Sequence, residues 1–227
     1  MVSVTELEFN GYKGQSVLGT FYRQDSPTDH LAMIFPGYGY TCDMPLLYLP
    51  KKMLVENGAD VLQVNYAFSN KPGFWQSGDE TRAIWFGSDA TVAMHTVLEK
   101  ADYKQFTLIG KSLGTLAVGH LVTLMSELAD ARIILFTPLL KNPRLVQQLA
   151  AFKGKTMLVV GADDPFHAAD NLKIIQKMRT VDVIEIPGTD HSLEIKGDVS
   201  HSLEVLGEVM QGVARFLQPN EAVLPVL

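Results

Sequence analysis

The residues best placed to do chemistry lie in the stretch Gly110-Lys111-Ser112-Leu113-Gly114. The apolar, β-branched run over residues 106–109 predicts a buried strand before it, and apolar residues at three- and four-residue spacing predict an amphipathic helix after it. A serine between two glycines at such a strand-to-helix turn is typical of a nucleophile elbow. The tight turn exposes the hydroxyl, and free N–H groups at the helix N-terminus can bind an oxyanion. The stretch therefore predicts a serine nucleophile for acyl transfer.

The same residues match the Gly-Lys-Ser end of a phosphate-binding loop. That motif needs another glycine five residues before its second glycine, and Gln105 stands there. A predicted strand also fills the interval that the loop would occupy. Because Gly-x-Ser-x-Gly occurs by chance in many chains, the flanking strand and helix carry the assignment to a nucleophile.

The composition indicates one globular domain over residues 1–227. Hydrophobic residues make up 47% of the chain and charged residues 19%, which is ordinary for a globular protein. The net charge of −6 provides no basic surface for nucleic acid. The single cysteine, Cys42, excludes an internal disulfide framework, and the N-terminus lacks the pattern of a signal peptide. No apolar run is long enough to cross a membrane, so we expect a soluble, cytoplasmic protein.

Short apolar strands alternate with helices along most of the chain. A hairpin is predicted over residues 4–23, followed by strands over 31–35, 60–66, 106–109, 132–136, 156–160 and 181–186. Besides the helix after the elbow, helices are predicted over 45–57, 79–100, 141–152, 168–179 and 200–217. Ser77 to Glu80 fits a capping box, and Gly87-Ser88 could mark a break in the helix that follows it. This alternation predicts an α/β fold, with a mostly parallel central sheet and helices on both faces.

The order of three residues resembles the α/β-hydrolase family. Ser112, Asp164 and His191 each follow a predicted strand, in the order nucleophile, acid and histidine. The resemblance implies the α/β-hydrolase fold, with Ser112 as nucleophile, His191 as general base and Asp164 as the carboxylate that orients the imidazole.

Two other residues compete for the roles of general base and orienting carboxylate. His201 repeats the His-Ser-Leu-Glu sequence of His191, but it falls in the first turn of the last predicted helix. Asp163 adjoins Asp164, which is favoured because the family spaces glycine and acid as Gly-x-x-Asp from Gly161. Asp190 is interpreted as a turn residue.

The resemblance also implies an oxyanion hole from the backbone N–H groups of Tyr38 and Leu113. In the loop that carries Tyr38, Pro36 replaces the family's common histidine. Residues 137–155 form a minimal cap, which predicts an open pocket. Its candidate wall residues, for which ordinary loop packing is an equal alternative, are Tyr40, Phe74, Trp75, Leu139 and Phe166. For Lys111, a solvated or salt-bridged side chain is favoured over attraction of an anionic substrate.

Together these features predict a serine hydrolase acting on the carboxylic ester or related acyl bond of a small molecule. A thioesterase or acyltransferase with the same three residues, and a non-catalytic binding protein on this fold, remain alternatives. No cluster has metal-ligand spacing and no dinucleotide motif is present, so neither metal nor cofactor is expected. The apolar residues within 218–227 predict that this tail packs on its own domain or on a partner subunit of an oligomer.

Overall fold

The computed structural model describes residues 1–66, 71 and 73–218. Within them, eight strands form one sheet in the order β1-β2-β4-β3-β5-β6-β7-β8. Contacts of β2 with β1 and β4 are antiparallel, and the other neighbours are parallel, which confirms the predicted mostly parallel sheet. The strands are β1 Val2–Asn10, β2 Ser16–Gln24, β3 His30–Phe35, β4 Asp60–Asn65, β5 Gln105–Lys111, β6 Arg132–Phe136, β7 Thr156–Gly161 and β8 Val181–Ile186.

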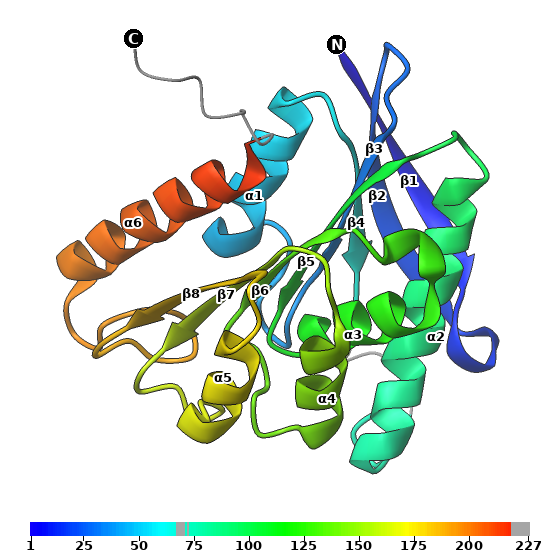
Figure 1. Ribbon diagram of the computed structural model, residues 1–227. Helices are drawn as coiled ribbons and strands as arrows, with labels where there is room; N and C mark the ends of the chain where they lie inside the picture. Colours follow the sequence, from blue (N-terminus) through cyan, green and yellow to red (C-terminus); the bar gives the residue numbers. More distant parts are fainter. Residues whose placement is uncertain (67–70, 72, 219–227) are drawn as a thin grey trace, which may run out of the picture.

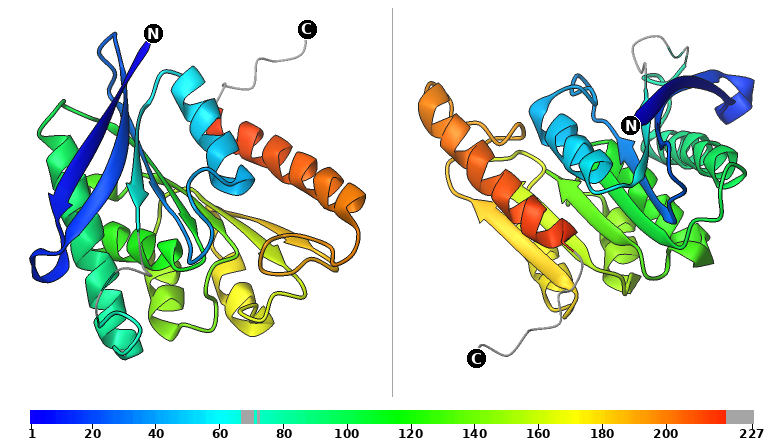
Figure 2. Two further views of the ribbon diagram at one scale, coloured as in Figure 1. Left: turned by 180° about the vertical axis from the view of Figure 1, so that it is seen from behind. Right: turned by 90° about the horizontal axis from the view of Figure 1, so that it is seen from above.

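Helices cover both faces of the sheet (Figure 1). On one face lie α1 Pro45–Glu56 and α6 Val199–Leu217, which contact each other. On the other face lie α2 Asp79–Leu98, α3 Gly114–Leu124, α4 Pro143–Ala151 and α5 Ala169–Gln176. Figure 2 shows the three layers from two further directions. No helix among the described residues is long and apolar enough to cross a membrane.

The central strand β3 shows how the sheet joins the two layers. Leu31, Met33 and Phe35 are fully buried in the core beneath α2 to α5. Ala32 and Ile34 are fully buried in the core beneath α1 and α6. Successive side chains of a strand point to opposite faces, so an uninterrupted apolar run is what a doubly covered strand requires.

Two details of the region around α2 differ from the sequence prediction. The N-cap of α2 is Gly78 with no side-chain cap, and Ser77 instead donates its hydroxyl hydrogen bond to Gly73 O at 2.7 Å, so the predicted capping box is wrong. The helix also runs unbroken through Gly87, so there is no break at this position. The glycine instead makes room for a neighbouring helix. A Cβ atom at Gly87 would lie 2.6 Å from Nδ1 of His120 in α3.

The proposed cap segment, residues 137–155, contains a turn followed by α4. Leu145, Val146 and Leu149 of α4 pack into the core beneath α2 to α5. Its description as a minimal cap over a substrate remains a prediction. The predicted packing of the tail after Gln218 lies outside the described residues.

Candidate active site

Ser112 lies in the turn between β5 and α3, in a conformation that side chains rarely adopt. Its φ of 53° is in the left-handed region, which typically costs of order 1–3 kcal/mol for a residue other than glycine. Hydrogen bonds hold it there. Its N–H donates to Phe136 O at 3.1 Å, and its carbonyl accepts from the N–H and the hydroxyl of Thr115. The turn is therefore fixed by both β6 and the first turn of α3.

The two glycines of the Gly-x-Ser-x-Gly stretch are required by close backbone approaches. A Cβ atom at Gly114 would lie 2.1 Å from Phe35 O in β3. One at Gly110 would lie 2.9 Å from Gly114 O across the turn. Real Cβ atoms do not come so close to backbone, so a side chain at either position would push α3 away from the sheet.

His191 and Asp164 meet Ser112 at the carboxyl ends of the parallel strands. His191 Nε2 lies 2.8 Å from Ser112 Oγ, and His191 Nδ1 lies 2.8 Å from Asp164 Oδ2. An ionised carboxylate only accepts hydrogen bonds, so Nδ1 carries the proton and Nε2 is left to accept from the serine hydroxyl. Asp164 is buried, and its other oxygen, Oδ1, accepts from the Phe166 N–H at 2.8 Å. The arrangement can withdraw a proton from Ser112.

Backbone contacts between two loops set the distance from Asp164 to His191. The loop after β7 donates from Ala162 N to Ile186 O and from Asp163 N to Thr189 O, both at 3.0 Å. Asp190 accepts from the N–H of Ser192 at 2.7 Å and shapes the turn that carries His191. This is the turn role that the sequence predicts for Asp190.

The competing residues lie elsewhere. His201 is an exposed residue in the first turn of α6, and its N–H donates to the capping residue Asp198 at 2.9 Å. The side chain of Asp163 is exposed, whereas that of Asp164 is buried against the imidazole. The geometry thus brings Ser112, His191 and Asp164 together and leaves both competitors outside.

The loop after β3 passes directly beside Ser112. A Cβ atom at Gly37 would lie 3.0 Å from the Cβ of Ser112. The Gly37 N–H donates to Tyr40 O at 3.1 Å, which closes the loop. Within the described part of the chain, neither the Tyr38 nor the Leu113 N–H donates to another protein group.

The predicted wall residues divide into exposed and buried groups. Phe166 is exposed, with its ring centroid 4.9 Å from that of His191, and exposed Trp75 packs edge-on against Tyr38 at 4.7 Å. Phe74 is fully buried and supports Trp75 at 5.0 Å. Tyr40 is buried and accepts from the Leu46 N–H, while Leu139 is half-buried against the core beneath α2 to α5.

Comparison with known proteins identifies the architecture. No protein-family model matches the chain, and no curated protein matches it in sequence. Among solved structures, a cold-adapted esterase from an Arctic intertidal metagenomic library superposes with a TM-score of 0.70 at 14% identity, over 96% of this chain and 95% of that one. An esterase from Pyrococcus furiosus gives 0.70 at 13% identity, over 95% and 92%. A protein of unknown function from Agrobacterium tumefaciens, described as a candidate α/β hydrolase, gives 0.71 at 19% identity, over 93% and 95%.

This chain has the α/β-hydrolase fold. In an open parallel sheet, ligands bind beyond the carboxyl ends of the strands. Ser112, Asp164 and His191 follow the carboxyl ends of β5, β7 and β8, so the residues that the sequence singles out occupy the expected edge of this α/β-hydrolase fold.

Lys111 is the residue near this site that sequence reasoning misjudged. It is 2% exposed, and no carboxylate among the described residues lies within salt-bridge distance of it, so the solvated or salt-bridged side chain expected from the sequence is wrong. Burial lowers the pKa of Lys111 to about 8, although Asp164 and Asp190 act in the opposite direction. The signal that could have indicated this burial is the position of Lys111 at the end of β5, a strand that is covered on both faces of the sheet.

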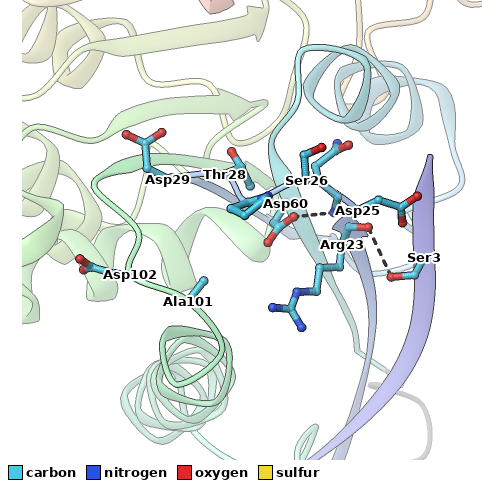
Figure 3. A pocket seen from close by; sticks show the side chains of 11 residues that line it. Ser3, Arg23, Asp25, Ser26, Thr28, Asp29, Asp60, Ala101 and Asp102 are labelled. Atoms are coloured by element: carbon cyan, nitrogen blue, oxygen red, sulfur yellow. Dashed lines mark hydrogen bonds between the residues drawn. The ribbon is translucent and has the colours of Figure 1, made fainter.

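Two of the cavities among the described residues lie at different edges of the α/β-hydrolase fold. The larger, of about 860 Å³, lies at the amino ends of the parallel strands, where Asp29, Asp60 and Asp102 surround it together with Arg23 (Figure 3). Asp60 is committed to the fold there, since it accepts from Gln24 N at 2.7 Å and from the Tyr103 hydroxyl at 2.6 Å. Because Ser112 follows the carboxyl end of β5, the larger cavity lies at the opposite edge of the sheet from it.

The smaller cavity, of about 430 Å³, lies beside the loop that carries His191, between the start of α1 and the first turns of α6. It is the cavity nearer to the candidate catalytic residues. No group of histidine, cysteine or acidic side chains among the described residues is arranged to hold a metal ion.

Proposed function

We propose that this protein is a serine hydrolase that cleaves a carboxylic ester or a related acyl bond of a small molecule. The observation that carries the proposal is the hydrogen-bonded series Ser112, His191 and Asp164, with both contacts at 2.8 Å. The left-handed backbone of Ser112 supports it, since strain of this kind persists where a function requires the shape. Two of the fold relatives are esterases, which agrees with this assignment.

In the first half of the reaction, Ser112 Oγ attacks the acyl carbon while His191 Nε2 takes the hydroxyl proton. Asp164 stabilises the resulting imidazolium and keeps the ring in one tautomer. The tetrahedral intermediate then collapses, and Nε2 gives the proton to the leaving oxygen as the bond to the alcohol breaks. An acyl-enzyme on Ser112 remains.

In the second half, water enters in place of the alcohol. His191 takes a proton from this water as it attacks the acyl-enzyme, and returns the proton to Ser112 Oγ when the carboxylic acid leaves. The N–H groups of Leu113 and Tyr38 stabilise the oxyanion in both halves. A donor of this kind typically contributes about 10²–10³-fold to kcat.

The side chains near the nucleophile favour an acyl group with apolar character. Phe166 lies against the imidazole of His191, and Trp75 lies against the ring of Tyr38, so exposed aromatic surface adjoins both the proposed base and the loop of one oxyanion donor. A thioester would use the same residues and the same steps, with a thiol as leaving group. A thioesterase or acyltransferase is thus a variant of this proposal that substrate profiling separates from an esterase.

The test is hydrolysis of a chain-length series of nitrophenyl esters and acyl thioesters by the wild-type protein and by Ser112→Ala. We expect hydrolysis of at least one series, with kcat/KM lowered by about 10³-fold or more in the variant. Unchanged hydrolysis by a folded Ser112→Ala variant would exclude Ser112 as nucleophile. Absence of any turnover by the wild type would favour a binding protein on this fold.

A further inference from the structure

The ammonium group of Lys111 joins three segments around the candidate active site. Its Nζ donates to the hydroxyl of Thr137 at 2.8 Å and to the main-chain oxygen of His191 at 2.8 Å. It also lies 5.0 Å from the centroid of the Tyr40 ring, within range of a cation–π interaction. One side chain thus connects the residue before Ser112 to the end of β6 and to the backbone of His191.

The contact at Thr137 adjoins the one that fixes Ser112. Phe136 O accepts from Ser112 N, and the next residue, Thr137, accepts from Lys111. Thr137 is itself held in a left-handed conformation, with a φ of 41°, while its N–H donates to Val159 O at 2.7 Å. Ser112 and Thr137, both in the left-handed region, therefore follow the ends of two neighbouring strands beside Lys111, and such strain clusters where a site requires a definite shape.

Burying the ammonium group of Lys111 in this space costs desolvation free energy. Without a carboxylate within salt-bridge distance among the described residues, the ammonium is compensated by two neutral oxygens and an aromatic face. An apolar side chain of similar size would avoid the desolvation penalty. Packing alone therefore does not explain a lysine at this position. Its hydrogen bond to the main-chain oxygen of His191 is the contact from which its role can be inferred.

We propose that Lys111 is a positioning residue of the reaction, which ties the backbone of His191 to the end of β6 and so holds the imidazole between Ser112 and Asp164. The inference rests on the proposed function, since it assigns the consequence of this contact to catalysis. It adds a residue that acts through His191 and has no contact with the substrate.

The protonation of Lys111 gives the proposal a distinctive signature. The groups that face it are Tyr40 from the loop after β3, Asp164 after β7, and Asp190 and His191 after β8. Burial raises the pKa of Tyr40 to about 12, well above that of Lys111 at about 8. Loss of the lysine proton weakens both charge-assisted hydrogen bonds. Activity of the wild type therefore declines as the pH rises through about 8.

The first test compares Thr137→Val with Thr137→Ser. Valine keeps the shape and β-branching of threonine but cannot accept from Nζ, whereas serine keeps the acceptor and loses the branch. We expect Thr137→Val to lower kcat about tenfold with little change in KM, and to move the alkaline decline to lower pH. Thr137→Ser should resemble the wild type in both respects. Equal kcat values and equal pH profiles for the two variants would overturn the proposal.

The second test is Lys111→Met, with the low-field proton resonance of the His191–Asp164 hydrogen bond as an independent measurement. We expect kcat to fall about 10²-fold, as for a misplaced catalytic group, and the alkaline decline to disappear. The resonance should be sharp in the wild type and broadened in Lys111→Met and Thr137→Val. Wild-type kcat with a sharp resonance in a folded Lys111→Met variant would refute the positioning role.

Failure of the proposed function gives a different result. If Ser112→Ala retains full activity, Ser112 is not the nucleophile, yet the resonance compared between the wild type and Lys111→Met still shows whether Lys111 holds the imidazole against Asp164. If Lys111→Met does not fold, the Thr137 pair decides the question, since neither substitution buries a new charge.

Discussion

Replacing Asp164 by asparagine tests the proposed role of the carboxylate with almost no change of shape. The Phe166 N–H donates to Oδ1 of Asp164 at 2.8 Å, so the amide oxygen of asparagine should take this position. The amide nitrogen is then directed toward His191 Nδ1, 2.8 Å away in the wild type. Since an amide nitrogen only donates, Nδ1 must become the acceptor and the ring proton must move to Nε2.

This tautomer cannot take the proton of Ser112. The expected loss is about 10³–10⁴-fold in kcat, or roughly 4–5.5 kcal/mol of transition-state stabilisation at 1.36 kcal/mol per factor of ten. The assay is kcat and KM on the best nitrophenyl ester of the series, with KM expected within a few-fold of wild type.

Asp163→Asn is the matched control. It makes the same chemical change at the adjacent, exposed side chain, and should keep at least half of the wild-type kcat. A kcat within tenfold of wild type for a folded Asp164→Asn variant, or equal losses in both variants, would show that the orientation argument is wrong.

Three further predictions follow from the contacts around this site and its supporting strands. His191→Ala should lower kcat for ester hydrolysis by about 10³-fold or more, whereas His201→Ala should leave kcat near wild type; the reverse result would place the general base on α6. Gly114→Ala should lower the free energy of unfolding in urea by about 2 kcal/mol or more, because its Cβ would lie 2.1 Å from a β3 carbonyl oxygen, while Gly207→Ala, open to solvent in α6, should raise it by about 0.5–1 kcal/mol. Burial lowers the pKa of His30 below 6.5, so as the pH falls the imidazole is protonated more readily in the unfolded chain than in the folded one. The free energy of unfolding in urea should therefore fall as the pH drops below about 6.5, and less steeply in His30→Gln.

Local sequence patterns predict most of the fold because its central strands are short apolar runs with clear ends. The predicted ranges 132–136 and 181–186 match β6 and β8 to the residue. The chain order of Ser112, Asp164 and His191 likewise identifies three residues that the structure brings into hydrogen-bond contact. These features depend on nearest neighbours in sequence and on the regular order of a parallel sheet.

The structure differs from the sequence prediction where contacts with a distant part of the chain determine how a residue is packed. Gly87 looks like a helix break in isolation, but it serves the packing of α2 against His120. Lys111 looks like a surface lysine, but its partners are 26 and 80 residues away along the chain, at Thr137 and His191. Neither contact leaves a pattern in the local sequence, so only the assembled sheet reveals them.

The most direct test of the central claim is the site of covalent modification by a fluorophosphonate, followed by peptide mapping. The proposed mechanism predicts one adduct per chain, located on Ser112, with loss of ester hydrolysis in proportion to labelling and no adduct on Ser112→Ala. An adduct on another residue, or full hydrolytic activity in protein whose Ser112 is quantitatively modified, would contradict the assignment of Ser112 as the nucleophile.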